Sequence, residues 1–521
     1  MDSTAAAEHR SPAPAGPPTG RAAHGRARWT DLAGLVVLAL VVRVPAYLSE
    51  RALTFDDGVF ANSAIAMRDG GVPFRDVFSS QGPLFLPLVW VGDLVGLRTL
   101  DAPRVLAVVS GVAAVVFTYL AASRLTDRIG ALLAGALLAT SGGLLWVTGP
   151  LAADGPALAF AALAFWLALC LRDRPTLPTT VALGAAVGAV LSTKSLEAPI
   201  LVPVVLVLAA PALSGLRRRR LEAHTLVQPV VAATSAVAVF LAVSLPLGWA
   251  DVWDQSVIYR TDAAADRDVP ATALKLVTTL WDRDLALLFL AAVALVCGVL
   301  ARRRSGHARD VQVEADDSWA SHHRGGPESA WAPSGRLLAV SWLGTTLAWL
   351  VLVVSPLWRP HVAAVAIPLV LVVAAYRPPV KVTLVAALLA VPMVVVQLDG
   401  LLVTGSYEGT EAQLVTALER LPDGAWVLSD EPGVVWRSGR RTTDDLVDPS
   451  MLRRQQDRYT EDSLVADASD PRICAFVAVS DQRFGHFDEL PERLGELGFV
   501  AQADVGDGSV LFVREPCDPS A

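Results

Sequence analysis

Long apolar runs alternate with short polar segments along most of this 521-residue chain. A helix needs about twenty consecutive apolar residues to cross the core of a bilayer. Eleven runs fit this pattern, at residues 30–48, 104–122, 130–148, 155–171, 180–193, 197–215, 228–248, 285–301, 337–354, 361–375 and 381–398. A twelfth run, Pro83–Leu97, is short and contains Pro87, Gly92 and Asp93, which favours an interfacial helix. The pattern predicts an α-helical polytopic membrane protein with about eleven transmembrane helices.

The distribution of basic residues predicts the orientation of these spans, because cytoplasmic loops are enriched in Lys and Arg. If the N-terminus is inside and Pro83–Leu97 is not a span, every second loop is cytoplasmic. Those loops hold Arg124 and Arg128, Arg172 and Arg174, Arg217 to Arg220, Arg302 to Arg304 with Arg309, and Arg377 with Lys381. Counting Pro83–Leu97 as a span would place all of these clusters outside. We therefore expect a cytoplasmic N-terminus and an extracytoplasmic C-terminus.

The composition supports a membrane protein, since 53% of the residues are hydrophobic, only 18% are charged, and the mean hydropathy is +0.47. The abundance of Ala, Val and Arg is typical of a high-GC bacterium, so the expected location is the bacterial plasma membrane. Residues 1–29 are predicted to be a disordered cytoplasmic tail. The net charge of −8 is unevenly spread and indicates no partner. We expect contact with membrane lipids and no nucleic-acid partner.

Two polar regions interrupt or follow the spans. The cytoplasmic loop 302–336 has the composition of an unstructured linker, in which the adjacent His322 and His323 are weak evidence for a metal site. Residues 401–521 alternate short strand patterns (WVLSD, ICAFVAVS, GSVLFVRE) with helical ones (EAQLVTALERL, LPERLGELGF), which predicts a small extracytoplasmic α/β domain. In an oxidising compartment Cys474 and Cys517 of this domain could pair; the alternative is two free thiols.

Charged residues within or beside the spans gather at one predicted membrane face, the outer one. They are Arg43, Asp56, Asp57, Asp154, Lys194, Glu197, Arg359 and His361. A carboxylate there could take a proton from a hydroxyl group, while Lys and Arg could hold a phosphate. This combination suits a reaction between a lipid phosphate and a water-side acceptor.

Structural explanations compete with this interpretation for several of these residues. The Arg43 side chain could simply extend along the lipid and place its charge at the membrane–water interface. Asp154, which precedes Gly-Pro, could be a helix N-cap, and Glu197 could only neutralise Lys194. Asp56 and Asp57 could cap the short helix predicted for GVFANSAIAMRDGG, a role that is compatible with catalysis.

The segment FDDGVFANSAIAMRDGGVPFRDVFSSQGPLF resembles the first extracytoplasmic loop of the glycosyltransferase C (GT-C) superfamily. The resemblance is to its protein O-mannosyltransferase and aminoarabinose-transferase type members (family 39 type). The shared features are an acidic pair after the first span, the aromatic Phe60, a short helix ending in glycine, the turn Pro73-Phe74-Arg75-Asp76, and the helix entry Pro83-Leu84-Phe85. Asp154, Lys194, Arg359 and His361 match later polar positions of the superfamily in order. Gly82 replaces its usual proline, and Asp57 replaces a glutamate.

The resemblance implies a GT-C catalytic domain over residues 30–400, with a first extracytoplasmic loop at 49–103, followed by a soluble domain at 401–521. It implies a sugar donor carried on a polyprenyl phosphate, an extracytoplasmic acceptor, and transfer by inverting displacement. The expected catalytic residues are Asp56, Asp57 and Asp154, and either of the adjacent acids could be the base. Lys194, Arg359 and His361 would bind the donor phosphate, with Arg43, Glu197 and Phe60 in support. The sugar could be a hexose such as mannose or a pentose such as arabinose. No cofactor is certain, and a divalent Mg or Mn ion remains open.

Two other classes of function fit a polytopic chain: a transporter or lipid flippase, and an inactive scaffold of the same fold. Transporters place ionisable groups near the bilayer midplane and often contain internal repeats. Here the charges lie at one edge, and we find no repeat.

Overall fold

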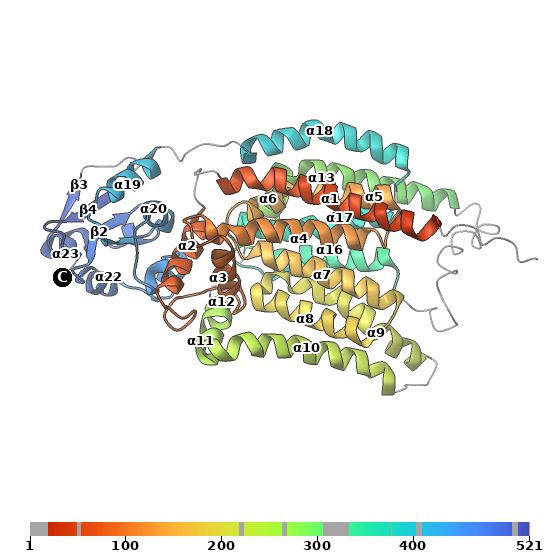
Figure 1. Ribbon diagram of the computed structural model, residues 1–521, viewed down its shortest axis with the longest axis horizontal. Coiled ribbons are helices and arrows are strands. Elements are labelled where there is room, and N and C mark those ends of the chain that lie inside the picture. The colour runs from red at the N-terminus through yellow and green to blue at the C-terminus, as the bar shows by residue number, and fades with distance from the viewer. Residues whose placement is uncertain are drawn as a thin grey trace, which may run out of the picture.

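A computed structural model describes residues 19–48, 54–217, 223–262, 268–305, 333–376, 378–402, 409–502 and 509–519. Long helices lie side by side in a bundle, and a smaller domain with a β-sheet sits at one end of it (Figure 1). We call this the domain end of the bundle. The arrangement confirms the predicted polytopic helical fold with a small C-terminal α/β domain.

The helices of the bundle follow the apolar runs. They are α1 (Thr19–Leu48), α4 (Val105–Ala122), α5 (Arg128–Ala139), α6 (Gly142–Thr148), α7 (Asp154–Asp173), α8 (Leu177–Thr193), α9 (Leu201–Arg217), α10 (Val227–Ser244), α13 (Val269–Ser305), α16 (Gly335–Leu352), α17 (Ala366–Tyr376) and α18 (Val380–Leu402). Helix α13 bends at Asp284, whose backbone leaves the helical conformation.

Each of the eleven predicted runs lies mainly in one of these helices or in a pair of them, and some extend into a neighbouring 3-10 turn. By length and composition, seven helices of the described residues can cross a membrane, or eight if the bent pair α5–α6 forms one span. The helix over the interrupted run, α3 (Phe85–Val95), has only 11 residues, as expected for an interfacial helix. The number of spans stays a prediction.

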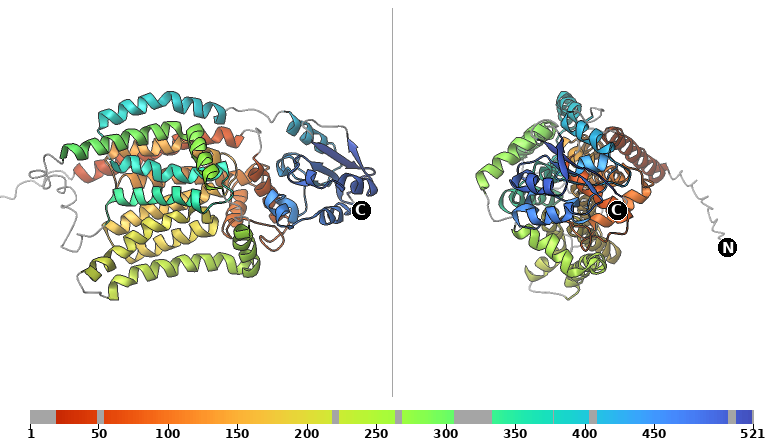
Figure 2. Two further views of the ribbon diagram at one scale, coloured as in Figure 1. Left: turned by 180° about the vertical axis from the view of Figure 1, so that it is seen from behind. Right: turned by 90° about the vertical axis from the view of Figure 1, so that its left-hand side faces the viewer.

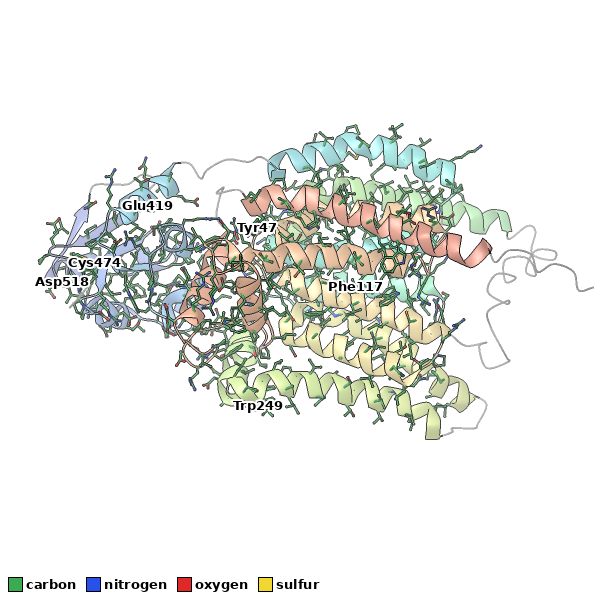
Figure 3. All side chains as sticks on the ribbon, in the orientation of Figure 1. Tyr47, Phe117, Trp249, Glu419, Cys474 and Asp518 are labelled. Atoms are coloured by element: carbon green, nitrogen blue, oxygen red, sulfur yellow. A yellow bond between two sulfur atoms is a disulfide. The ribbon has the colours of Figure 1, made fainter. Side chains whose placement is uncertain are left out.

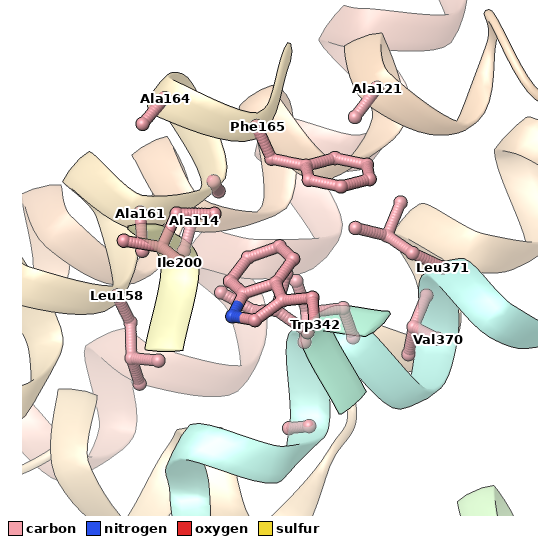
Figure 4. Packing of buried hydrophobic residues seen from close by; sticks show 14 of the residues in the cluster. Ala114, Ala121, Leu158, Ala161, Ala164, Phe165, Ile200, Trp342, Val370 and Leu371 are labelled. Carbon is pink, nitrogen blue, oxygen red and sulfur yellow. The ribbon is translucent and has the colours of Figure 1, made fainter. Parts of the chain in front are cut away.

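Small residues allow the central helices to pack closely. Alanines of α4 and α7 are fully buried, and the Phe165 and Trp342 rings stack at 5.0 Å between their centroids (Figure 4). Close approach through small side chains is the usual way in which transmembrane helices gain packing energy. The core therefore holds α4, α7, α16 and α17 in a fixed arrangement.

Two sequence predictions change or fall outside the described residues. Helix α1 begins at Thr19, so the prediction of a disordered tail is wrong for residues 19–29, where Ala- and Arg-rich sequence extends the helix. Residues 1–18, most of the 302–336 loop, and His322 and His323 lie outside the described residues.

The C-terminal domain is built on a four-stranded sheet in the order β1-β2-β4-β3. The strands are β1 (Trp426–Ser429), β2 (Ile473–Ala478), β3 (Phe499–Gln502) and β4 (Val510–Arg514), and only β1 and β2 are parallel. The helices are α19 (Thr410–Glu419), α20 (Pro432–Arg437), α21 (Met451–Gln455), α22 (Glu461–Ala468) and α23 (Leu490–Glu496). Cys474 of β2 forms a disulfide with Cys517, and Cys474 is labelled in Figure 3. The pattern had indicated β1, β2 and β4, whereas β3 begins at a residue predicted as helix.

Three segments outside the bundle meet at the domain end. The first follows α1 and contains α2 (Phe55–Arg68), α3 and the 3-10 turn η1 (Ala102–Arg104). The second contains α11 (Trp249–Trp253), the π-helical turn η5 (Asp254–Ile258) and α12 (Tyr259–Asp262). The third is the C-terminal domain, which covers much of the domain end when the molecule is viewed along the bundle (Figure 2).

Candidate active site

Helix α2 begins inside the FDDG motif and fixes one of its two acids. Thr54 is the N-cap, and its hydroxyl accepts a hydrogen bond from the Asp57 amide at 3.2 Å. The buried Asp57 carboxylate then accepts bonds from Arg104 Nε at 3.1 Å, Arg104 Nη2 at 2.6 Å and the Leu151 amide at 2.8 Å. Both of its oxygens are therefore used to join α2 to η1 and to the turn that follows α6.

The neighbouring Asp56 is in the opposite situation. It is half-buried, and within the described part of the chain no hydrogen bond or ion pair reaches its carboxylate. Burial raises the pKa of Asp56 to about 6, a shift that Lys194 opposes and that Asp154 and Asp448 reinforce. A carboxylate with free oxygens and a pKa near neutrality is suited to accept a proton.

Asp154 and Lys194 form a buried ion pair next to Asp56. Asp154 is the first residue of α7 and Lys194 is the C-cap of α8, and their Nζ and Oδ2 atoms lie 2.6 Å apart. Glu197 follows in the 3-10 turn η2 (Ser195–Ile200), where it is 1% exposed and its Oε1 has no hydrogen-bond partner among the described residues. A buried and unsatisfied carboxyl oxygen is costly unless a ligand or water meets it.

His361 lies with Asp56, Asp154, Lys194 and Glu197, whereas Arg359 does not. Both belong to the 3-10 turn η7 (Arg359–Val365), where His361 Nδ1 accepts a long hydrogen bond from the Trp358 amide at 3.4 Å. The charges of Asp154 and Lys194 act directly on the His361 ring. Arg359 is exposed, and its charge acts on Arg283. We refer to Asp56, Asp154, Lys194, Glu197 and His361 together as the charged cluster.

Arg43 and Phe60 take structural positions. The fully buried Arg43 guanidinium donates to Thr148 Oγ1 of α6 at 3.0 Å, to the Ala39 carbonyl of its own helix and to the Ala139 carbonyl at the end of α5. The Phe60 ring packs edge-to-face on Phe85 with the ring centroids 4.6 Å apart. The contacts of Arg43 are thus with α1, α5 and α6, and that of Phe60 is with α3.

The Gly82-Pro83-Leu84 segment explains how the first loop meets Lys194. The Gly82 amide binds the Thr193 carbonyl at 3.0 Å, and the Leu84 amide binds the Ser192 carbonyl at 2.7 Å. These carbonyls belong to the last turn of α8 and would otherwise lack partners. A Cβ atom on Gly82 would overlap the Ser192 backbone, so glycine permits the contact. The loop therefore caps the helix that presents Lys194.

Three functional neighbours were not found from the sequence. Arg104 pairs with Asp57; Arg260 of α12 binds the Ser80 carbonyl and hydroxyl oxygens at 3.1 Å each; and Asp448 of the C-terminal domain acts on Asp56. Arg104 lies at the start of an apolar run, which was a usable signal. Arg260 and Asp448 lie in polar segments that look like ordinary surface, so no local pattern marked them.

The residues described by the structure include no group of three or more His, Cys, Asp or Glu side chains arranged to hold a metal ion. The charged cluster instead mixes carboxylates with a lysine and a histidine. Its own side chains can accept a proton at Asp56 and offer positive charge at Lys194.

Comparisons with known proteins bear on the family and the fold of this chain. A family model described as dolichyl-phosphate-mannose-protein mannosyltransferase matches residues 80–249, about a third of the chain. No curated protein matches the chain. The fold is similar to that of ArnT from Cupriavidus metallidurans bound to undecaprenyl phosphate, with a TM-score of 0.54 and 14% identity over 92% of this chain and 97% of that chain. The Archaeoglobus fulgidus oligosaccharyltransferase tethered to an acceptor peptide gives a TM-score of 0.49 and 12% identity over 92% and 73%.

The family match over a third of the chain and the similarity of the fold to that of ArnT agree with the resemblance to the GT-C superfamily that the first-loop motif predicted.

Proposed function

We propose that this protein transfers a sugar from a polyprenyl-phosphate donor to a hydroxyl group of an extracytoplasmic acceptor. The observation that carries the proposal is the unpartnered Asp56 carboxylate beside the buried Asp154–Lys194 pair. Asp56 can take the acceptor proton, while Lys194 can bind a phosphate. The similarity of the fold to ArnT, whose structure holds undecaprenyl phosphate, supports a lipid-linked donor.

In the proposed reaction, Asp56 accepts the proton of the acceptor hydroxyl as its oxygen attacks the anomeric carbon of the sugar. The bond between that carbon and the phosphate oxygen breaks in the same step, so the configuration inverts and the polyprenyl phosphate leaves. Because the two acids differ in their partners, Asp56 rather than Asp57 is the proposed base. The ion pair between Asp57 and Arg104 fixes the start of α2 and so positions the neighbouring Asp56.

The leaving phosphate gains negative charge as its bond to the sugar breaks. A cation that is already positioned stabilises this charge without having to reorganise. Lys194 is the proposed cation, and the neutral His361 ring of the charged cluster is a proposed hydrogen-bond donor to the phosphate. Arg359, which lies outside the cluster, would contact the phosphate only from the exposed side. Asp154 would keep Lys194 oriented until the phosphate arrives. The identity of the sugar is not part of this proposal.

The orientation is also part of the proposal, with the N-terminus cytoplasmic and the C-terminal domain outside. Helices α4, α5 and α7 each have an end that lies away from the domain end, and these ends are flanked by Arg124, Arg128, Arg172 and Arg174. Basic residues are expected there if that side of the bundle is cytoplasmic. The Cys474–Cys517 disulfide suits an oxidising compartment.

The test is Asp56→Asn in membranes that contain the full chain. The asparagine side chain cannot take the proton, so transfer from undecaprenyl-phosphate sugars should fall by roughly a hundred- to ten-thousandfold. The measurement is incorporation of radiolabelled sugar from a panel of such donors into bacterial envelope material. Asp262→Asn, an exposed acid of α12, serves as the control and should leave transfer unchanged.

Asp57→Asn separates the two acids. It removes the carboxylate charge that pairs with the buried Arg104 at 2.6 Å, so it should destabilise the protein by about 3–5 kcal/mol, whereas Asp56→Asn should not. A wild-type protein that transfers no sugar from any donor, or an Asp56→Asn variant with normal activity, would refute the proposed function.

A further inference from the structure

The C-terminal domain brings a buried acid, Asp448, to the charged cluster. Asp448 follows the 3-10 turn η8 (Asp445–Val447) and is 6% exposed. Its carboxylate Oδ1 accepts the Ser450 amide at 3.1 Å. Arg453 pairs with Asp445 at 3.0 Å and donates to the Asp448 backbone oxygen at 3.1 Å, so no ion pair within the described part of the chain uses the Asp448 carboxylate.

The position of Asp448 is fixed by packing across the two domains. The preceding Val447 is 1% exposed and lies in one hydrophobic cluster with Phe60 of α2 and Phe85 of α3. The following Ser450 shares a hydrogen bond of 3.2 Å with the Tyr259 hydroxyl of the second segment. Residues on both sides of Asp448 are therefore anchored to elements of the first and second extramembrane segments.

Asp448 lies within electrostatic range of Asp56 and Arg260. The charge of Asp448 acts on Asp56, and that of Arg260 acts on Asp448, Asp56 and His361. Ser80 holds the Arg260 guanidinium through Nε and Nη2. Like Asp56 and Asp448, Arg260 forms no ion pair among the described residues, so all three can bind an external molecule.

We infer that Asp448 is an acceptor-binding residue and that the C-terminal domain completes the active site, an inference that rests on the proposed function. Asp448 would accept a hydrogen bond from a hydroxyl group next to the one that Asp56 deprotonates. Arg260 would bind a neighbouring acceptor oxygen.

The same geometry indicates the chemical class of the acceptor. Two carboxylates close together repel an anionic group and favour donors of hydrogen bonds. A polyhydroxylated glycan offers adjacent hydroxyls to both Asp56 and Asp448, whereas a Ser or Thr side chain offers one. We therefore infer a neutral glycan acceptor rather than a phosphorylated lipid or a peptide.

The test compares Asp448→Asn with Asp457→Asn in the full-length protein. Asp457 is exposed in the same segment, and its φ of 52° is tolerated by asparagine. The donor is the undecaprenyl-phosphate sugar that the wild type uses, and the acceptors are neutral mannan and arabinan oligosaccharides, a phosphorylated glycolipid and a Ser/Thr peptide.

For Asp448→Asn we expect the half-saturating concentration of the glycan to rise at least about tenfold, because loss of a hydrogen bond to a charged group weakens binding by about that factor. The donor half-saturation and the thermal midpoint should stay within error, and Asp457→Asn should match the wild type. Equal loss for donor and acceptor, or no loss, would overturn the role of Asp448 while leaving transfer intact. Preference for the phosphorylated lipid or the peptide would overturn the acceptor class. No transfer by the wild type from any donor would instead refute the proposed function, and the inference with it.

Discussion

Adjacent side chains of identical chemistry acquire different properties at the start of α2. Asp57 accepts three hydrogen bonds and pairs with the buried Arg104, so its charge is fully compensated. Asp56 has no such partners and shares its surroundings with other acids. The difference arises because successive residues at a helix start point to different sides: Asp57 toward η1 and Asp56 toward the charged cluster.

The pH dependence of transfer should report on Asp56. A base must be ionised, and burial raises the pKa of Asp56 to about 6. Activity should therefore be nearly constant above pH 7 and fall about tenfold per pH unit below pH 6. The measurement is kcat/KM between pH 4.5 and 8, and a profile that stays flat down to pH 4.5 would exclude Asp56 as the base.

Asp448→Asn should shift this profile in a defined direction. The negative charge of Asp448 raises the pKa of Asp56, so its removal should lower that pKa. The acidic limb should move to lower pH, while Asp457→Asn should leave it in place. A limb that moves to higher pH would contradict the arrangement of the two acids.

At the scale of elements, α2 is the piece that joins the two domains. Its Gly58 packs against the backbone of Gly433 at the start of α20, and its Asn62 side chain donates to the Pro432 carbonyl at 2.9 Å. The next turn of α20 continues the contact, because Trp436 Nε1 donates to the Leu100 carbonyl at 3.0 Å. Helix α2, which carries the proposed base, is thus held by η1 through Asp57 and by α20 of the C-terminal domain through Gly58 and Asn62.

Gly58→Ala should weaken this junction. The added methyl group would overlap the Gly433 backbone, which cannot move as a flexible side chain would, so we expect a loss of about 1–3 kcal/mol. The measurement is the thermal unfolding midpoint of the full chain, with transfer activity beside it. Gly495→Ala is the matched control, because that helical position in α23 has open space around it and should be neutral or slightly stabilising. Equal midpoints for the two variants would contradict a tight α2–α20 contact.

At the scale of the whole molecule, three segments distant in sequence close over the domain end. Gln255 of the second segment binds the first loop at the Ser79 amide and at the Phe74 carbonyl, at 2.9 and 2.6 Å. Asp254 pairs with Arg458 of the C-terminal domain at 2.6 Å. The charged cluster lies beneath this junction, so bundle and soluble domain together define what reaches it.

The proposed orientation predicts which thiols are accessible from outside the cell. After mild reduction of intact cells, a membrane-impermeant maleimide should label Cys517, while the fully buried Cys474 and the half-buried Cys170 of α7 and Cys297 of α13 should react much more slowly. Labelling should depend on reduction, because the two cysteines form a disulfide. Labelling only after the cells are lysed would place the C-terminal domain in the cytoplasm and contradict the proposal.

The sequence alone predicted the helical bundle, the short helix α3, three of the four strands and the resemblance to the GT-C superfamily. These follow from local patterns, because a bilayer requires backbone groups to be paired within each segment and so ties hydropathy to helix position. The tertiary structure alone decided which charges meet: Asp154 with Lys194 across 40 residues, and Asp57 with Arg104 across 47. It also brought Asp448 to Asp56 from another domain. Such pairings depend on how helices and loops pack, and no periodicity along the chain records them.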